Sequence, residues 1–367
     1  MLQIKTPEIY VNEPGAIKSL GSLVDTYGKR ALIVWSKTAR KVTQEEVIES
    51  LGVERINYME YLFEGYPTLE KAGQIAELAR EKDIEVLIAI GGGRVLDVTK
   101  AAGDISSLPV ASVPTIAATC AAWAALSVLY TDEGNFDHFR QNKHSPRLIV
   151  ADTQILADAP IRYLRAGVAD TLAKWYETAV LRGDSFSYLN SVNSARLAFD
   201  FLNEKAEKVI EDAQANKTDE TTAKTVDAIL FLAGNVGSYV GEKAYSGFAH
   251  PFYHSSRIIK ETRGTLHGEL VAFGLIMQAV LEKKSGEEIQ AIVRKFRELK
   301  VAFTLEDIGI TDEAEKKLQI ISDRIYEAFP NLTLLKGNKD ERAIVNAAYE
   351  ADFYVKADRR EVEHVYG

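Results

Sequence analysis

The sequence holds few of the residues that build disulfide-stabilised, membrane or nucleic-acid-binding proteins. Cys120 is the only cysteine among 367 residues, so no intrachain disulfide can form. No apolar run approaches the roughly 20 residues that cross a bilayer, and the N-terminus lacks the basic and apolar segments of a signal peptide. Lysine and arginine number 44 against 53 acidic residues, and the net charge of −9 disfavours nucleic acid as a partner. We therefore expect a cytoplasmic protein that binds neither nucleic acid nor membrane.

The composition is that of a folded chain long enough for two domains. Hydrophobic residues make up 46% of the chain and charged residues 26%, which are globular values. In the first part of the chain, short apolar runs alternate with helical patterns, and the predicted strands cover residues 31–35, 86–90, 110–113 and 148–151. This alternation predicts a parallel sheet covered on both faces by helices. The helical patterns that follow predict an all-α region, so we place the boundary between residues 155 and 156.

The histidines are scarce and unevenly placed. Of the six in the chain, His250, His254 and His267 fall in one short region, and Asp170 lies upstream of them near the start of a predicted helix. One carboxylate with two imidazoles binds a divalent transition metal and leaves a coordination position open. The alternative is that these are core histidines satisfied by hydrogen bonds, the usual state of an isolated histidine among apolar residues. We predict that the other three histidines lie on the surface: His138, His144 and His364.

A glycine triplet follows the predicted strand 86–90. Gly91, Gly92 and Gly93 run into a predicted helix that carries Asp97 and Lys100 on its first turns. Glycine leaves room for a phosphate, and the helix that follows offers free backbone amides to it. The alternative is a tight strand-to-helix turn that holds no ligand.

Two threonines follow the next predicted strand. Thr115 and Thr119 come after strand 110–113, at the edge where open α/β sheets bind their ligands. The alternative is that both side chains only cap the loop. A phosphate-binding turn together with an open metal site predicts a nucleotide-dependent metalloenzyme.

These segments together resemble the iron-containing (group III) alcohol dehydrogenase superfamily, and within it the glycerol dehydrogenase-like branch. The matching segments are GGGRVLDVTK (91–100), VPTIAATCAAWAALSVLY (113–130), AGVADTLAKWYE (166–177), AHPFYH (249–254) and HGELVAFG (267–274). The resemblance implies a Rossmann-like dinucleotide-binding domain over residues 1–155 and an all-helical metal- and substrate-binding domain over 156–367. It also implies an active site in the cleft between them, an NAD(P) cofactor and a homo-oligomer.

The resemblance assigns roles to individual residues. It implies that the metal ligands are Asp170, His250 and His267, and that His254 lies near the nicotinamide or in a proton path. The implied cofactor contacts are Gly92, Gly93, Asp97, Thr115, Thr119, Leu126 and Tyr130. Ala124 stands where glycerol dehydrogenases carry serine, and Cys120 and Trp123 are expected in the substrate pocket.

One departure from the family pattern concerns the cofactor. NAD-preferring relatives carry an aspartate after the first nucleotide-binding strand, where its carboxylate holds the ribose 2′-hydroxyl. Here Ser36 and Lys37 follow that strand. Serine does not repel a 2′-phosphate, and Lys37 or Arg40 can attract one. We therefore predict that NADP(H) is accepted.

A second departure concerns the substrate. Cys120 occupies the position of an aspartate that helps glycerol dehydrogenases to hold the polyol, and the surrounding PTIAATCAAW resembles hydroxycarboxylate dehydrogenase A, a reductase of 2-oxo acids. We interpret Cys120 as a small buried residue and not as a nucleophile. Loss of the carboxylate removes repulsion against an acid, and Lys174, one helical turn beyond Asp170, is the candidate partner for it. The alternative for Lys174 is an ordinary exposed helix lysine.

The sequence thus predicts a metal-dependent, NAD(P)-linked oxidoreductase of small 2-oxo or 2-hydroxy acids, with zinc favoured over iron. The first alternative is a glycerol or other polyol dehydrogenase. A second is a dehydroquinate synthase-like lyase, a family whose first metal ligand is glutamate whereas this chain has Asp170. A third is a non-catalytic binding protein, against which the complete set of three ligands argues.

Overall fold

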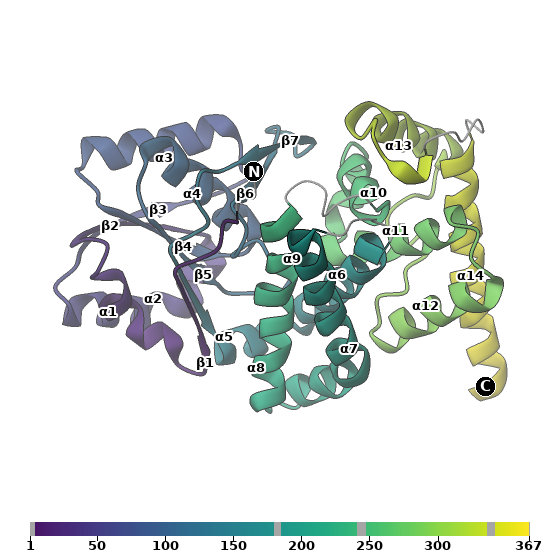
Figure 1. The fold of residues 1–367 in the computed structure, drawn as a ribbon, viewed down its shortest axis with the longest axis horizontal. Coiled ribbons are helices and arrows are strands. Elements are labelled where there is room, and N and C mark those ends of the chain that lie inside the picture. The colour runs from purple at the N-terminus through teal and green to yellow at the C-terminus, as the bar shows by residue number, and fades with distance from the viewer. Residues whose placement is uncertain (1–3, 180–184, 241–246, 336–341, 367) are drawn as a thin grey trace. The chain divides into compact units, whose positions relative to one another are not determined.

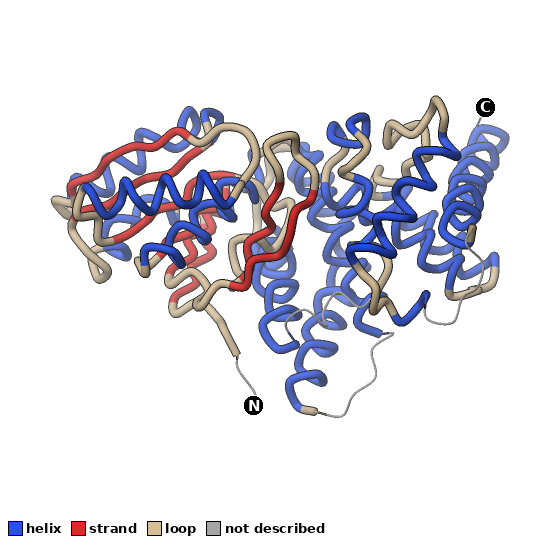
Figure 2. The backbone as a smooth tube through the Cα atoms, turned by 90° about the horizontal axis from the view of Figure 1, so that it is seen from above, coloured by secondary structure: helices blue, strands red, loops and turns tan. Residues whose placement is uncertain are grey.

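The computed structural model describes residues 4–179, 185–240, 247–335 and 342–366. The chain divides into two compact units, one of residues 1–164 and 208–239, the other of residues 165–207 and 240–367. The predicted single boundary at 155/156 places residues 208–239 with the helical part, whereas this division places them in the first unit. Figure 1 traces the chain and Figure 2 shows where strands and helices lie along it. No helix in the described ranges has the length and apolar character that crossing a membrane demands.

The first unit is built on a six-stranded parallel sheet with the strand order β1-β8-β5-β4-β2-β3. The strands are β1 (Ile9–Glu13), β2 (Arg30–Trp35), β3 (Asn57–Leu62), β4 (Val86–Gly91), β5 (Val110–Pro114) and β8 (Leu148–Asp152). The predicted parallel sheet is confirmed, and its four predicted strands are the buried central ones. The sequence patterns missed β1 and β3 because these edge strands are mostly half-buried or exposed and include polar residues.

Helices cover both faces of this sheet. They are α1 (Leu20–Val24), α2 (Lys37–Val53), α3 (Leu69–Glu81) and α4 (Gly93–Ser106), with a 3₁₀ turn η1 (Ala16–Ser19) before α1. In Figure 1, α1 and α2 lie on one side of the strands and α3 and α4 on the other. Alternate strand residues such as Ile33, Ile88 and Val150 form one buried cluster with α1 and α2, as the two-residue period of a strand requires.

Three later segments complete the first unit. An antiparallel hairpin of β6 (Leu126–Tyr130) and β7 (Phe136–Gln141) follows β5, and α5 (Thr153–Asp158) follows β8. The chain returns as α8 (Glu220–Asp227), a π-helical turn η2 (Ala228–Leu232) and α9 (Ala233–Val240). Asp227 Oδ1 accepts hydrogen bonds from Tyr10 and Asn12, both at 2.8 Å, which ties α8 to edge strand β1.

The second unit is helical. Its elements are α6 (Ile161–Ala179) from residue 165 on, α7 (Phe186–Gln214) up to residue 207, α10 (Ala249–Ser256), η4 (Lys260–Gly264), α11 (His267–Leu281), α12 (Gly286–Glu298), α13 (Ala314–Ala328), η5 (Thr333–Leu335) and α14 (Ala343–Tyr366). Helix α11 is buried along most of its length. Its second residue, Gly268, meets α6 so closely that a Cβ atom would lie 1.8 Å from the carbonyl oxygen of Ala166.

The structure corrects one local prediction in this unit. Asp170 was expected near the start of a helix, but α6 begins at Ile161, directly after Pro160, and continues through Gly167. Proline is favoured at helix starts, whereas a single glycine weakens a helix without ending it. The helical pattern of the sequence covers residues 164–181, and its predicted end at Leu181 lies outside the described residues.

A candidate nucleotide turn and a candidate metal centre

In the first unit, the glycine triplet forms the junction between β4 and α4. Gly91 ends the strand with φ +155°, and a Cβ there would lie 3.0 Å from Val95 Cγ2. Gly92 caps α4, and Gly93 is its first residue. A Cβ on Gly93 would lie 3.8 Å from Thr119 Oγ1, and the Thr115 amide donates to Gly91 O at 3.2 Å. The two predicted threonines thus lie beside the predicted turn, and the start of α4 supplies the amides that a phosphate needs.

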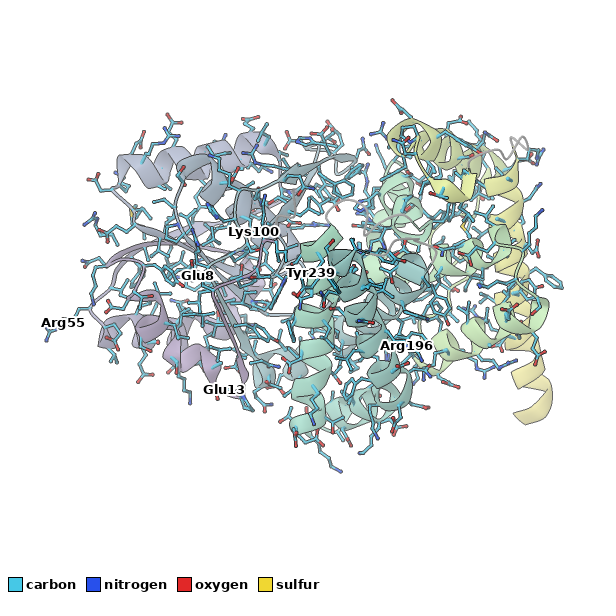
Figure 3. All side chains as sticks on the ribbon, viewed as in Figure 1. Glu8, Glu13, Arg55, Lys100, Arg196 and Tyr239 are labelled. Atoms are coloured by element: carbon cyan, nitrogen blue, oxygen red, sulfur yellow. The ribbon has the colours of Figure 1, made fainter. Side chains whose placement is uncertain are left out.

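Lys100 fixes the loop that faces this turn. Its ammonium group is buried and lies 2.9 Å from Asp97 Oδ1. It also donates to the carbonyl oxygens of Ala121, at 2.7 Å, Ala124 and Leu126. Figure 3 shows Lys100 inside the first unit, whereas Arg55 points outward from it. Asp97, which was predicted to contact the cofactor, is therefore also the counter-ion of Lys100, the buried lysine that holds residues 121–126.

Burial sets the charge balance of this pair. It raises the pKa of the Asp97 carboxyl, while Lys100 and the backbone N–H of Val128 lower it, and the net shift is upward. A buried charge without a partner is costly, so loss of either Asp97 or Lys100 should destabilise the folded chain.

The aromatic residues of the loop pack within the same unit. Trp123 is 5% exposed, its ring centroid lies 5.6 Å from that of Tyr10 and 5.1 Å from that of Phe231, and its indole N–H donates to Ser238 Oγ. The predicted pocket residue Trp123 is therefore held in an aromatic cluster. Tyr130 lies beside Tyr66, with ring centroids 5.9 Å apart, and Cys120 is buried.

The residues predicted to accommodate the 2′-phosphate of NADP(H) lie at the start of α2. Ser36 caps this helix, and its hydroxyl accepts from the Ala39 amide at 3.2 Å. Lys37 is exposed, whereas the Arg40 guanidinium pairs with Glu60 at 2.7 Å. Of the two predicted cations, Arg40 has a carboxylate partner, so Lys37 is the stronger candidate.

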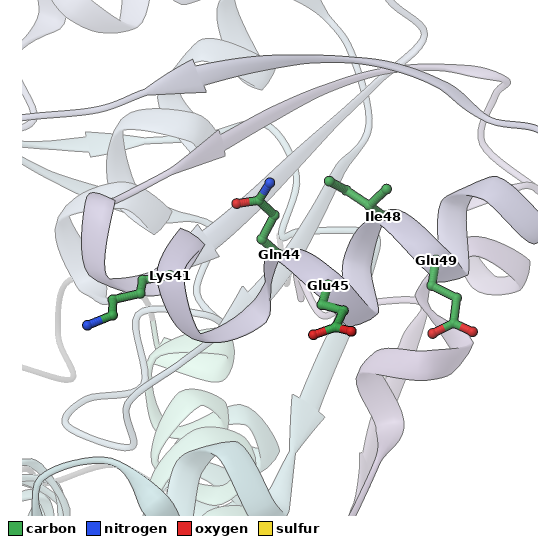
Figure 4. A pocket seen from close by; sticks show the side chains of 5 residues that line it. All are labelled: Lys41, Gln44, Glu45, Ile48 and Glu49. Carbon is green, nitrogen blue, oxygen red and sulfur yellow. The ribbon is translucent and has the colours of Figure 1, made fainter.

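A shallow depression along the middle of α2 carries no site. Its lining residues all come from that one helix, as Figure 4 shows: Lys41, Gln44, Glu45, Ile48 and Glu49. Ligand sites bring polar groups together from several elements, and this surface does not.

In the second unit, three predicted metal ligands converge. Asp170 comes from the middle of α6, His250 from the first turn of α10, and His267 is the first residue of α11. His250 Nε2 lies 3.1 Å and His267 Nε2 3.2 Å from the same oxygen of Asp170, Oδ1. All three ligand atoms lie within 4.8 Å of one another. This donor set suits zinc or iron in a site that keeps a position for substrate.

Lys174 lies beside this cluster. Its side chain is 6% exposed, and its Nζ is 3.8 Å from Asp170 Oδ1, one turn along α6. The alternative of an ordinary exposed lysine is therefore wrong. Burial alone would raise the pKa of the Asp170 carboxyl, but Lys174 and the two histidines lower it well below its usual value, so Asp170 is an anion.

Two residues that the sequence patterns did not single out hold the start of α10. Glu177, 1% exposed, accepts from the His250 backbone N–H at 3.0 Å, and its second oxygen contacts His250 Nδ1. Gln278 of α11 accepts from the Phe248 amide at 2.8 Å. The spacing does carry a signal for Glu177, because residues 170, 174 and 177 recur on one face of a helix.

His254 lies one turn beyond His250 in α10 and is buried. Its ring packs edge-on against Tyr253, with ring centroids 4.8 Å apart, and its centroid lies 6.3 Å from that of His267. Burial, followed by the charges of His267, His250 and Arg257, lowers the pKa of His254 well below its usual value. His254 is therefore a neutral imidazole near the ligand cluster. His138 and His144 are exposed, as predicted, whereas the side chain of His364 lies outside the described residues.

Comparison with known proteins identifies the family. Residues 7–153 match the iron-containing alcohol dehydrogenase family. A glycerol dehydrogenase of Pseudomonas putida is 32% identical over 327 residues, which cover 87% of this chain and 88% of that protein. The chain belongs to the iron-containing alcohol dehydrogenase family. Its members act on CH–OH groups, so it is an oxidoreductase of a family that uses NAD(H) and a divalent metal.

Relatives of this chain carry more than one name. Hydroxycarboxylate dehydrogenase A of Escherichia coli (strain K12) is 32% identical over 280 residues, 75% of this chain and 76% of that protein. The crystal structure of glycerol dehydrogenase from Schizosaccharomyces pombe superposes with a TM-score of 0.88 at 22% identity, covering 99% of this chain and 93% of that one. The predicted fold of an α/β part followed by a helical part is confirmed.

Proposed function

We propose that this protein is a metal-dependent, NAD(P)-linked dehydrogenase that interconverts a small 2-oxo acid and the matching 2-hydroxy acid. The observation that carries this proposal is the burial of Lys174 at 3.8 Å from Asp170. The proposed metal ligands are Asp170, His250 and His267, and zinc is the proposed ion.

The charges around this cluster favour an anionic substrate. Asp170 and Glu177 bring two negative charges, while Lys174 and a divalent ion bring three positive ones. In a buried place this surplus is only weakly screened, so a carboxylate gains more there than a neutral hydroxyl does. Cys120 in place of an aspartate removes the group that would oppose such a substrate.

Each residue then has a defined task. When bound, the metal would polarise the substrate carbonyl as a Lewis acid and the nicotinamide would exchange a hydride with its carbon. Lys174 would pair with the substrate carboxylate and orient it. The buried, neutral imidazole of His254 would relay a proton: during reduction one ring nitrogen gives its hydrogen to the carbonyl oxygen, directly or through water, while the other nitrogen takes a proton from water, and oxidation reverses both transfers.

The proposed cofactor contacts are those of the glycine turn and its neighbouring loop. Gly92 and Gly93 would admit the pyrophosphate, with Thr115 and Thr119 beside it. Leu126 and Tyr130 would lie towards the nicotinamide. Ser36 with the exposed Lys37 supports acceptance of NADP(H), because neither side chain repels a 2′-phosphate.

A glycerol dehydrogenase is the second candidate, because several relatives carry that name, among them those of Pseudomonas putida and Citrobacter freundii. The buried Lys174 and Cys120 favour the acid over the polyol.

The initial rate of NADPH oxidation by the zinc-loaded protein tests the proposal, with 2-oxobutanoate and dihydroxyacetone as parallel substrates and NADH as the comparison cofactor. We expect turnover of 2-oxobutanoate and little of dihydroxyacetone. Turnover of dihydroxyacetone alone would make the protein a polyol dehydrogenase, and a clear preference for NADH would overturn the cofactor proposal.

A further inference from the structure

We propose that Glu177 is a positioning residue, which fixes the ring orientation and the tautomer of His250 so that Nε2 offers its lone pair to the metal. The inference rests on the proposed metal centre, but its tests do not require a substrate. It concerns a residue that binds neither metal nor substrate and acts through a ligand.

The contacts of Glu177 are directed at one histidine. One carboxylate oxygen accepts from the His250 backbone N–H at 3.0 Å, and the other contacts the ring nitrogen Nδ1. The opposite ring nitrogen, Nε2, lies 3.1 Å from Asp170 Oδ1. The ring of His250 is thus held between two carboxylates of the same helix, α6.

The packing leaves this carboxylate little freedom. Glu177 is 1% exposed, and Gly247 faces it so closely that a Cβ there would lie 2.2 Å from Glu177 Cγ. Gln278 holds the neighbouring Phe248 amide, so the segment that leads into His250 is fixed from α11 as well. A glycine at 247 is therefore needed for the carboxylate to reach the ring.

The chemistry of imidazole turns these contacts into a choice of tautomer. A neutral imidazole has one donor and one acceptor nitrogen, and a carboxylate can only accept. Both ring nitrogens of His250 face a carboxylate, Nδ1 that of Glu177 and Nε2 that of Asp170. A metal bound by Nε2 and Asp170 would take the place of a hydrogen on Nε2, and Glu177 would then keep the remaining hydrogen on Nδ1. A carboxylate on the outer nitrogen also makes the ligand more basic, and removal of such a partner weakens metal binding by about 10- to 100-fold.

The alternative is that Glu177 only caps the N-terminus of α10, which begins at Ala249. Substitution by glutamine separates the two roles. Glutamine keeps an oxygen for the His250 backbone N–H but places an NH₂ group opposite Nδ1. The neutral ring must then accept at Nδ1 and carry its hydrogen on Nε2, where it blocks the metal.

The zinc affinity of Glu177→Gln, measured by competition with a chelator, tests the inference. We expect a loss of about 10- to 100-fold relative to the wild type. Glu282→Gln is the matched control, because Glu282 accepts from Gln278 at 2.8 Å in the same network without touching an imidazole. Its zinc affinity should match the wild type. An unchanged affinity in Glu177→Gln would leave only the capping role.

A second measurement needs no variant. In the zinc-loaded wild type labelled with ¹⁵N-histidine, long-range ¹H–¹⁵N spectra should show His250 with its hydrogen on Nδ1 and the metal on Nε2. Zinc on Nδ1, or a hydrogen on Nε2, would overturn the inference even if Glu177→Gln failed to fold. A protein that reduced no carbonyl compound would refute the proposed function while leaving both readouts intact.

Discussion

The two candidate sites are built by different means. The turn in the first unit consists of backbone: glycines that leave space, the amides of α4, and a loop whose carbonyl oxygens are held by the buried Lys100. The metal centre in the second unit consists of side-chain atoms aimed from α6, α10 and α11. The turn should therefore be sensitive to added volume and to loss of the loop's anchor, and the metal centre to loss of single donor atoms. The following predictions test this difference, from the largest expected effect to the smallest.

Removal of a donor atom should have the largest effect. In His250→Ala we expect the zinc content to fall to near zero and kcat/KM to fall by about 10³-fold, since metal polarisation of a carbonyl is worth several kcal/mol. The zinc content of the purified protein and initial rates with 2-oxobutanoate check this. Retention of one equivalent of zinc would mean that His250 is not a ligand.

Loss of Lys100, which holds the loop of residues 121–126, should mainly lower the stability of the folded chain. Lys100→Met leaves Asp97 buried without its cation, and removal of one partner of a buried pair costs about 3–5 kcal/mol. Urea unfolding measures this loss. Since the pKa of Asp97 is raised in the folded chain, the folded state binds a proton more readily than the unfolded state, and the deficit should shrink as the pH falls. A deficit that grows towards acid pH would contradict the assignment.

A methyl group added at a glycine should have different effects at the two sites. A Cβ at Gly268 would lie 1.8 Å from a backbone oxygen of α6, so Gly268→Ala should lose about 1–3 kcal/mol of stability and displace His267. A Cβ at Gly93 meets only ordinary contacts, so Gly93→Ala should melt near the wild-type temperature but bind the cofactor less tightly. Thermal melts and cofactor titrations check the pair. Equal cofactor affinity in Gly93→Ala and wild type would remove the phosphate role of this turn.

Removal of the exposed charge at the start of α2 should have the smallest effect. Lys37→Ala should raise the KM for NADPH by about two- to five-fold, because an exposed ion pair is worth about 1 kcal/mol or less. The KM for NADH should stay the same. An equal change for both cofactors would show that Lys37 does not read the 2′-phosphate.

Much of the fold could be predicted because its signals are local. The central strands are continuous apolar runs, and the glycine triplet follows one of them directly. The edge strands β1 and β3 were missed because half-exposed strands lose the apolar run that marks a buried one. The three candidate ligands Asp170, His250 and His267 were predicted from their residue types and from the family resemblance, and their side chains lie together in the structure.

What the sequence could not show depends on partners far along the chain. Glu177 meets His250 across 73 residues, and Trp123 meets Ser238 across 115. No local sequence pattern around Glu177 or Trp123 predicts which distant residue it contacts. The burial of Lys174 could not be predicted either. Its spacing from Asp170 is equally compatible with an exposed and with a buried helix face.

The substrate preference of Lys174→Met tests the central claim most directly. The measurement is the ratio of kcat/KM for 2-oxobutanoate to that for dihydroxyacetone, in the zinc-loaded wild type and the variant. Loss of a charge-assisted hydrogen bond worth about 1.5–3 kcal/mol should lower this ratio by roughly 10- to 100-fold, with the rate on dihydroxyacetone little changed. A ratio that stays the same in the variant would contradict the proposal that Lys174 binds the substrate carboxylate.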